Sequence, residues 1–232
     1  MTNRPIQPDQ WLSVFADEPE GVAISRGATP PGFLIVQNAL DAAACQEIVQ
    51  ACAPVKGVSS TIGASDGTAG NFKSEVRTSD FIDVRRLSVN IPAMIERIFR
   101  NYVEPNYNVS VDWFELPEIL RYGPGGEYAV HADAENWNAG KQRWERIKDR
   151  DLSLLLYIDD GFTGGEIDFP NFGMKLPPKR GLLIVFPSDG RYVHAARPVT
   201  SGVRHVIVSW AATKNAALRG RKPPPGAIVL SE

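Results

Sequence analysis

Residues 178–211 read PKRGLLIVFPSDGRYVHAARPVTSGVRHVIVSWA. Three short apolar segments, 182–186, 191–196 and 203–211, are separated here by Pro, Asp and Gly, which favour turns. Similar segments precede them at 109–122, 128–132, 152–158 and 165–169. Short strands at this spacing are typical of an antiparallel sandwich or barrel and not of alternating strand–helix units. The sequence therefore predicts a mainly β core over residues 106–212.

Residues 1–105 have a different pattern and predict a helical support for that core. We expect helices over 8–17, from Asp41 onward and over 91–100, and a strand over 32–38. The helix from Asp41 has an apolar face that suits packing against a sheet. The first half of the chain is therefore predicted to buttress the second.

The predicted organisation is one domain over residues 1–212, followed by an exposed tail over 213–232. Only two cysteines are present, Cys45 and Cys52, and both fall within one predicted helix. Two helical turns separate them by roughly 10 Å, which is too far for a disulfide. Buried free thiols are expected, and these suit a reducing compartment.

Composition argues against several classes of partner. The chain has 25 Lys and Arg against 27 Asp and Glu, a formal net charge of -2, whereas a general nucleic-acid or anionic-membrane binder needs a basic excess. The apolar run LLIVF at 182–186 is far too short to span a membrane. We therefore expect a soluble, cytoplasmic protein with neither a nucleic-acid nor a membrane partner.

Of the three histidines, His131, His194 and His205, the first two suggest a metal centre. In extended backbone His131 and Asp133 project to the same face and can address one atom, and His194 is a candidate third ligand. Two imidazoles and one carboxylate are typical of non-haem Fe(II) oxygenases, although zinc hydrolases also use this set. The alternative is that His131 and His194 are half-buried sheet residues bonded to backbone carbonyls.

Arg204 lies in the apolar segment VRHVIVSWAA, where even-numbered positions share one face. A buried, unpaired guanidinium would cost several kcal/mol, so this face needs an anion. A ligand carboxylate fits the two parallel hydrogen bonds that Arg offers. The alternative is a pair with an Asp or Glu of the protein. His205 projects to the opposite face and is expected to be structural.

Four segments together resemble the Fe(II)/2-oxoglutarate-dependent dioxygenases, in particular their prolyl 4-hydroxylase-like branch. They are SEVRTSDFID (74–83), RYGPGGEYAVHAD (121–133), LSLLLYIDDGFTGGEIDFP (152–170) and residues 178–211. The family fold implied is a double-stranded β-helix, a cupin-like jelly roll with helices against one sheet, which agrees with the strand pattern.

The resemblance also implies roles for individual residues. His131, Asp133 and His194 match the iron ligands, and Arg204 matches the basic residue that binds the distal carboxylate of 2-oxoglutarate. Tyr122 matches a tyrosine that hydrogen-bonds the same carboxylate. Related halogenases have a small residue at the position of Asp133, so a carboxylate there implies hydroxylation.

Two further residues and two loops are candidates for contact with the substrate. Arg77 and Trp210 match positions near the substrate, although Trp210 fits a core aromatic equally well. The glycine-rich stretch 57–71 is a candidate lid. So is the charged insert 134–150, for which some helical character is expected.

The activity implied is hydroxylation of an aliphatic C–H bond, most directly of a prolyl residue in a peptide or protein, with 2-oxoglutarate decarboxylated to succinate. Fe(II) is the implied cofactor and 2-oxoglutarate and O2 are the cosubstrates, while ascorbate is left open. One alternative is a hydroxylase of a free amino acid or other small metabolite. Another is a non-catalytic, metal-binding jelly roll. The oligomeric state is left open.

Overall fold

The computed structural model describes residues 15–18, 22–25, 29–59, 77–214 and 223–230. Its helices are α1 (Ala42–Cys52), α2 (Ile91–Ile98) and α3 (Glu104–Tyr107), with a π-helical turn η3 (Phe99–Val103) and 3-10 turns η2 (Val84–Arg86), η4 (Pro170–Phe172) and η5 (Gly190–Tyr192). Its strands are β1 (Phe15–Glu18), β2 (Val22–Ser25), β3 (Leu34–Gln37), β4 (Val58–Ser59), β5 (Asp80–Asp83), β6 (Val111–Phe114), β7 (Glu118–Tyr122), β8 (Tyr128–His131), β9 (Glu135–Asn138), β10 (Arg143–Arg146), β11 (Leu152–Tyr157), β12 (Thr163–Gly164), β13 (Ile167–Phe169), β14 (Met174–Leu176), β15 (Leu183–Pro187), β16 (His194–Ala196), β17 (Val199–Ser201), β18 (Arg204–Thr213) and β19 (Ile228–Val229).

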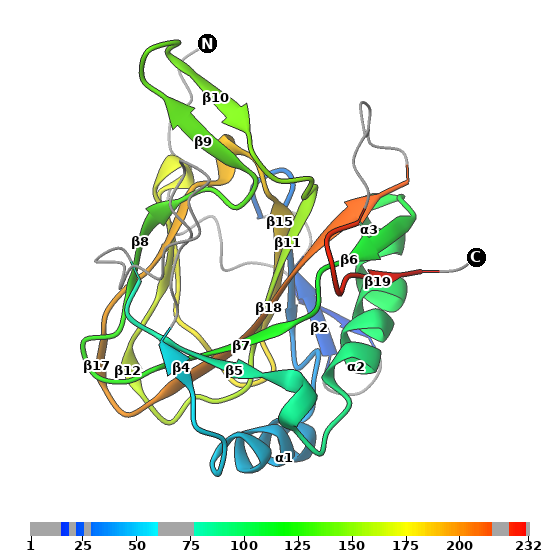
Figure 1. The fold of residues 1–232 in the computed structure, drawn as a ribbon. Helices are drawn as coiled ribbons and strands as arrows, with labels where there is room; N and C mark the ends of the chain where they lie inside the picture. Colours follow the sequence, from blue (N-terminus) through cyan, green and yellow to red (C-terminus); the bar gives the residue numbers. More distant parts are fainter. Residues whose placement is uncertain (1–14, 19–21, 26–28, 60–76, 215–222, 231–232) are drawn as a thin grey trace.

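Two antiparallel sheets form the walls of the barrel (Figure 1). The large sheet runs β1-β2-β3-β15-β11-β18-β7-β5-β4, and β6 and β19 extend it beside β18. The small sheet runs β14-β13-β16-β8. This mainly β jelly roll confirms the predicted fold class, because strands distant in sequence pair antiparallel within each wall.

The helices cover the outer face of the large sheet (Figure 1). Asp41 caps α1 as predicted, and its Oδ1 accepts a hydrogen bond of 2.8 Å from the backbone N–H of Ala44. Asn90 caps α2 in the same way through Ala93, with Pro92 in the first turn. These caps begin each helix where its apolar face can meet the sheet.

Alternation along the strands divides the interior into two cores. On β11, Leu154 and Leu156 face the helices, whereas Leu155 and Tyr157 face the space between the sheets. The outer core fastens the helices to the large sheet. The inner core lines the barrel that holds the site.

Several predicted boundaries are wrong in informative ways. The support over residues 1–105 is not only helical, because β3 continues the large sheet beside β15 and β5 continues it beside β7. Of the helix predicted at 8–17, residues 8–14 lie outside the described chain and Phe15–Glu18 form β1. Of the loop predicted at 57–71, residues 60–71 lie outside the described chain and Val58–Ser59 form β4.

The insert at 134–150 is a β-hairpin and not a helix. β9 and β10 pair antiparallel, with Trp137 opposite Trp144 and the two rings 5.7 Å apart. The backbone N–H of Ala134 donates to the carbonyl of Ser188, which fixes one end of the hairpin to the barrel. Helix propensity from its many charged residues was overridden by this anchoring and by the aromatic cross-strand pair.

The predicted exposed tail over 213–232 is partly buried where the structure describes it, and residues 215–222 and 231–232 lie outside the described chain. β19 pairs with β6, and Leu230 is 4% exposed within the outer core. The apolar run that ends the described chain contributes a short edge strand instead of remaining in solvent. In the described part of the chain, no helix is both long and apolar enough to cross a membrane.

Candidate active site

The pairing of two strands brings the three predicted metal ligands together. β8 ends at His131, Asp133 follows two residues later, and His194 begins β16. In the antiparallel register His194 is directly opposite His131, so the imidazole centroids are 4.3 Å apart. The small sheet thus places two ligands on one wall of the barrel.

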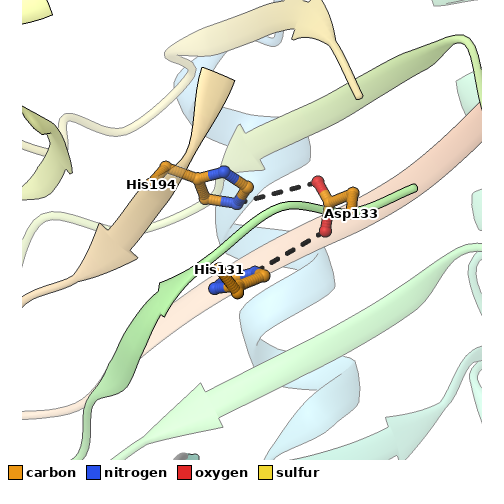
Figure 2. Close-up of side chains that lie close together, drawn as sticks. All are labelled: His131, Asp133 and His194. Carbon is orange, nitrogen blue, oxygen red and sulfur yellow. Dashed lines mark ion pairs between the residues drawn. The ribbon is translucent and has the colours of Figure 1, made fainter. Parts of the chain in front are cut away.

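The side chains of these residues converge (Figure 2). One ligand atom from each of the three lies within 4.8 Å of the others. The Nε2 atoms of His131 and His194 lie 3.6 Å and 3.7 Å from the Asp133 oxygens Oδ1 and Oδ2, respectively. These separations are longer than a hydrogen bond and suit atoms that share an ion.

Backbone carbonyls fix the second nitrogen of each imidazole. His131 Nδ1 is 2.8 Å from the carbonyl oxygen of Ala129, and His194 Nδ1 is 3.1 Å from that of Tyr192. Because a carbonyl only accepts, each Nδ1 carries a proton, and in the neutral tautomer with that proton the lone pair is on Nε2, which faces Asp133. The carbonyl-bonded alternative is therefore true of one nitrogen per ring and leaves the other free for a metal.

The electrostatics favour the protonation states that bind metal. Burial lowers the pKa of His194 to about 4, so its ring is neutral at pH 7. Burial alone would raise the pKa of Asp133, but His194, His131 and Arg150 outweigh it and hold that pKa well below its usual range. A neutral imidazole and an ionised carboxylate are the forms that coordinate a divalent ion.

Aromatic rings enclose the two histidines. The ring of Tyr128 stacks on His131 with centroids 3.6 Å apart, and the ring of Phe186 lies edge-on to His194 at 4.9 Å. The side chain of His194 is 5% exposed and that of His131 is 17% exposed. The site is therefore shielded by apolar rings and is more open on the side of His131.

Arg204 is buried inside the barrel without an anionic partner. It is 1% exposed, and the carbon at the centre of its guanidinium lies 4.0 Å from the ring centroid of Tyr122, the residue opposite it on β7. Its Nη1 donates to the carbonyl of Gly165 at 2.6 Å, but Nε and Nη2 have no hydrogen-bond partner within the described chain. The predicted alternative, a pair with a protein carboxylate, is absent among the described residues. A carboxylate supplied by a ligand would complete this site.

Gly165 allows the close approach to Arg204. Its φ of +71° is in the left-handed region, and a Cβ at this position would lie 3.0 Å from Arg204 Nη1. The Gly-Gly-Glu motif thus has a local function, which is to turn a carbonyl toward the guanidinium.

Tyr157 is a residue of this chamber that sequence reasoning missed. It ends β11 on the inner face and is 2% exposed. Burial raises its pKa to about 12, and the nearby Arg204 acts in the opposite direction. Tyr122 is buried with it, and burial raises the pKa of Tyr122 as well. Alternation from Leu155 was the available signal, because it places Tyr157 in the barrel.

Trp210 lies beneath a buried arginine. The guanidinium carbon of Arg150 is 3.6 Å from the Trp210 ring centroid, and Arg150 also pairs with Glu115 and donates to the carbonyl of Asp133 at 3.2 Å. Trp210 is 9% exposed. This arrangement suits a core aromatic that supports the metal site, and contact with substrate stays a prediction for Trp210.

Arg77 lies beside the more open face of the site. Its guanidinium carbon is 5.3 Å from the ring centroid of Tyr128, the residue that stacks on His131. Its Nε is buried and has no hydrogen-bond partner within the described chain. Its contact with substrate also stays a prediction. His205, by contrast, binds Asp159 through both its backbone N–H and its ring, in the expected structural role.

Comparisons with known proteins agree with this architecture. Residues 117–212 match the family model described as the 2OG-Fe(II) oxygenase superfamily. The Arabidopsis thaliana protein named "Probable prolyl 4-hydroxylase 9" is 30% identical over 206 residues, covering 78% of this chain and 68% of that protein. Prolyl 4-hydroxylase 1 of the same plant is 25% identical over 206 residues, covering 79% and 68%. A viral collagen prolyl hydroxylase from Paramecium Bursaria Chlorella virus-1, solved with 2OG, has a TM-score of 0.57 at 22% identity and covers 79% and 97% of the two chains.

The barrel, its His-Asp-His cluster and the family match over residues 117–212 together indicate an oxygenase of the non-haem iron class. This chain belongs to the 2OG-Fe(II) oxygenase superfamily and is prolyl hydroxylase-like. It is therefore an enzyme of a family that uses Fe(II), 2-oxoglutarate and O2, as the sequence predicted. Use of ascorbate stays a prediction.

Proposed function

We propose that this chain hydroxylates an aliphatic C–H bond of a prolyl residue in a peptide or protein. The observation that carries the proposal is the pairing of two complementary sites in one barrel. A cluster of two imidazoles and one carboxylate lies on the small sheet, and a buried guanidinium without an anion lies on the large sheet. The names of the relatives support prolyl hydroxylation as the reaction.

In this proposal His131, Asp133 and His194 hold the iron, because one potential ligand atom from each lies within 4.8 Å of the others. When bound there, Fe(II) supplies the activation of O2 that couples decarboxylation of 2-oxoglutarate to succinate with hydroxylation of the substrate. Two protein nitrogens and one carboxylate leave positions for outside ligands, which is what a two-cosubstrate reaction needs.

Arg204 and Tyr122 bind and orient the distal carboxylate of 2-oxoglutarate in this proposal. The unpartnered Nε and Nη2 of Arg204 offer two donors on a buried cation. The hydroxyl of Tyr157, buried near Arg204, is a third candidate donor. Binding the distal carboxylate of 2-oxoglutarate fixes where its reacting end can lie, and this orientation is the main contribution of the protein to the reaction.

In this proposal the aromatic rings exclude water, and the more open side of the site receives the substrate. Tyr128 and Phe186 exclude water around the two histidines. Arg77 lies beside Tyr128, where a substrate would approach His131. We assign the substrate side of the site to this face.

The test is a turnover screen with purified chain, Fe(II) and 2-oxoglutarate. Proline-containing peptides and free amino acids are compared for succinate release, and mass spectrometry checks for one added oxygen atom in the product. We expect peptide-dependent succinate release with the oxygen on proline, and loss of both in His131→Ala. Efficient turnover of a free amino acid, with the peptides inert, would replace this proposal with the metabolite-hydroxylase alternative.

A further inference from the structure

One oxygen of Asp133 is already engaged by a buried hydroxyl. Ser153 Oγ lies 2.6 Å from Asp133 Oδ2, and Ser153 is 1% exposed on the inner face of β11. The other oxygen, Oδ1, has no hydrogen-bond partner as close among the described contacts. The carboxylate is therefore asymmetric: Oδ2 lies 3.7 Å from His194 Nε2 and also accepts from a buried hydroxyl, whereas Oδ1 lies 3.6 Å from His131 Nε2.

A second buried hydroxyl extends the contact. Ser188 Oγ lies 2.8 Å from Ser153 Oγ, and Ser188 is 2% exposed. An ionised carboxylate only accepts, so Ser153 must donate its single proton to Asp133. The bond between the serines then has one direction, with Ser188 donating to Ser153.

The backbone holds Ser188 in place. Its N–H donates to the carbonyl of Asp151 at 3.0 Å, and its carbonyl accepts from the N–H of Ala134 at 2.9 Å. Ala134 immediately follows Asp133, and Asp151 is two residues before Ser153. The segments that contain Asp133 and Ser153 are thus both bonded to Ser188, which immediately follows β15. These backbone hydrogen bonds set the relative positions of the three side chains.

We propose that Ser188 and Ser153 form a hydroxyl relay that positions Asp133 and reserves Oδ1 for the metal. The inference rests on the proposed metal-binding role of His131, Asp133 and His194. Both serines act through Asp133 and are positioning residues.

The relay has a consequence for the number of open positions. A six-coordinate ion that takes one atom from each of its three protein ligands keeps three positions for outside ligands. If Asp133 swung round and used both oxygens, one of these positions would be lost. Engagement of Oδ2 by Ser153 opposes that rotation, because it would leave the buried Ser153 hydroxyl without the carboxylate oxygen to which it donates.

Co(II) binding to the chelator-treated full chain tests the relay without any turnover. The visible ligand-field absorption of Co(II) depends on the number and the arrangement of its ligands, so a change in how Asp133 binds changes the spectrum. Ser153→Thr keeps the hydroxyl, and Ser153→Val has almost the same shape without it. We expect the Thr variant to keep the wild-type affinity and spectrum. The Val variant should bind Co(II) roughly 10–100-fold more weakly, the range for lost partners of metal ligands, with a visible spectrum that differs from that of the wild type.

Ser188 supplies an independent measurement. Ser188→Ala should lower Co(II) affinity less than Ser153→Val does, because Ser153 keeps its bond to Asp133. Adding Ser188→Ala to Ser153→Val should cost nothing further, because the relay is already broken. Circular dichroism of the metal-free variants shows whether each one folds. If Ser153→Val does not fold, the Co(II) affinity and spectrum of Ser188→Ala alone test the relay.

The relay is overturned if Ser153→Val and Ser153→Thr bind Co(II) with the same affinity and spectrum, or if Ser188→Ala matches the wild type in both. Failure of the metal site itself has a different signature. In that case His131→Ala would bind Co(II) as tightly as the wild type, whatever the serine variants do.

Discussion

The surroundings of Arg204 indicate most clearly what charge a ligand must have. Two of its nitrogens are buried without a hydrogen-bond partner in the described chain, and the one bond it makes is to a neutral carbonyl. Leaving a buried cation unpaired is costly, so binding of an anion recovers that energy. The proposed ligand carboxylate explains why the sequence tolerates an arginine in an apolar strand.

Arg204→Ala is therefore expected to weaken 2-oxoglutarate binding far more than metal binding. Loss of hydrogen bonds between charged groups, about 1.5–3 kcal/mol each, corresponds to roughly 10–100-fold or more in affinity. The measurement is an anaerobic titration of the Fe(II)-loaded chain with 2-oxoglutarate, followed by the visible charge-transfer band. Fe(II) affinity is measured separately.

Arg197→Ala is the matched control, because Arg197 is also a strand-region arginine but already pairs with Asp168 and has a side chain that is 45% exposed. It should leave 2-oxoglutarate affinity unchanged. A collapse of Fe(II) affinity in Arg204→Ala, with 2-oxoglutarate binding intact, would show that the assigned role is wrong.

Residues that we propose to contact a ligand directly were easier to find in the sequence than residues that would act through neighbours. His131, Asp133 and Arg204 follow from alternation along a strand and from the cost of burying charge. Ser153 and Arg150 contact Asp133 only because separate strands meet in the folded barrel. Their residue types and spacing carry no signal for that meeting.

At the scale of elements, the β9–β10 hairpin shows where local propensity misleads. Within the described chain its strands pair only with each other, so the hairpin projects from the barrel (Figure 1). Its charges suggested a helix, whereas the cross-strand tryptophan pair and the anchoring at Ala134 select a hairpin. The alternation of residue types in the sequence could predict the barrel strands, since each of those strands has an inner and an outer face. An exposed hairpin lacks that pattern.

The hairpin carries an exposed tryptophan a few residues after a proposed metal ligand, and we expect it to contribute to peptide binding. Trp137 is 49% exposed, four residues after Asp133. Trp137→Ala should raise the KM for a proline-containing peptide several-fold, because the substitution removes an exposed aromatic ring that can pack on an extended peptide. Binding of Fe(II) and 2-oxoglutarate should not change, since the ring contacts neither proposed site.

Val229→Ala is the control for loss of exposed apolar surface, because Val229 is 62% exposed on β19, outside the small sheet that carries the histidines. Its peptide KM should equal that of the wild type. An unchanged KM in Trp137→Ala would remove the hairpin from the substrate side of the site and leave residues 57–71 as the remaining predicted lid.

At the scale of the whole molecule, the large sheet separates the outer core, which packs on the helices, from the inner core, which surrounds the candidate site. Its outer face packs on α1 and α2, and its inner face lines the chamber of Arg204. The chain pattern could predict this division, because period-2 strands and an amphipathic helix imply a covered face. The edge strands β1, β4 and β19 were not predicted, since short edge pieces add little apolar pattern to the sequence.

The separation predicts a pH effect that comes from the outer core alone. Cys45 and Cys52 are free, fully buried in α1, and lie on the helix side of the sheet. Burial raises the pKa of each thiol to about 11, from an ordinary value of about 9. The folded state therefore keeps its thiol protons at a pH where the unfolded chain releases them, so the thiol contribution to stability is complete below pH 9 and is lost as pH rises toward 11.

The measurement is the free energy of unfolding by urea, under reducing conditions, for the wild type and for Cys45→Ala/Cys52→Ala at several pH values from 7 to about 10.5. Alanine does not titrate, so subtracting the two curves cancels the tyrosine and lysine contributions that also change in this range. We expect a constant difference up to about pH 8. Above pH 9 the wild type should lose its advantage by up to roughly 1.4 kcal/mol per pH unit for each thiol. A difference that stays level to pH 10.5 would mean that the thiols ionise in the folded protein as they do in the unfolded chain, and that the outer core admits water around α1.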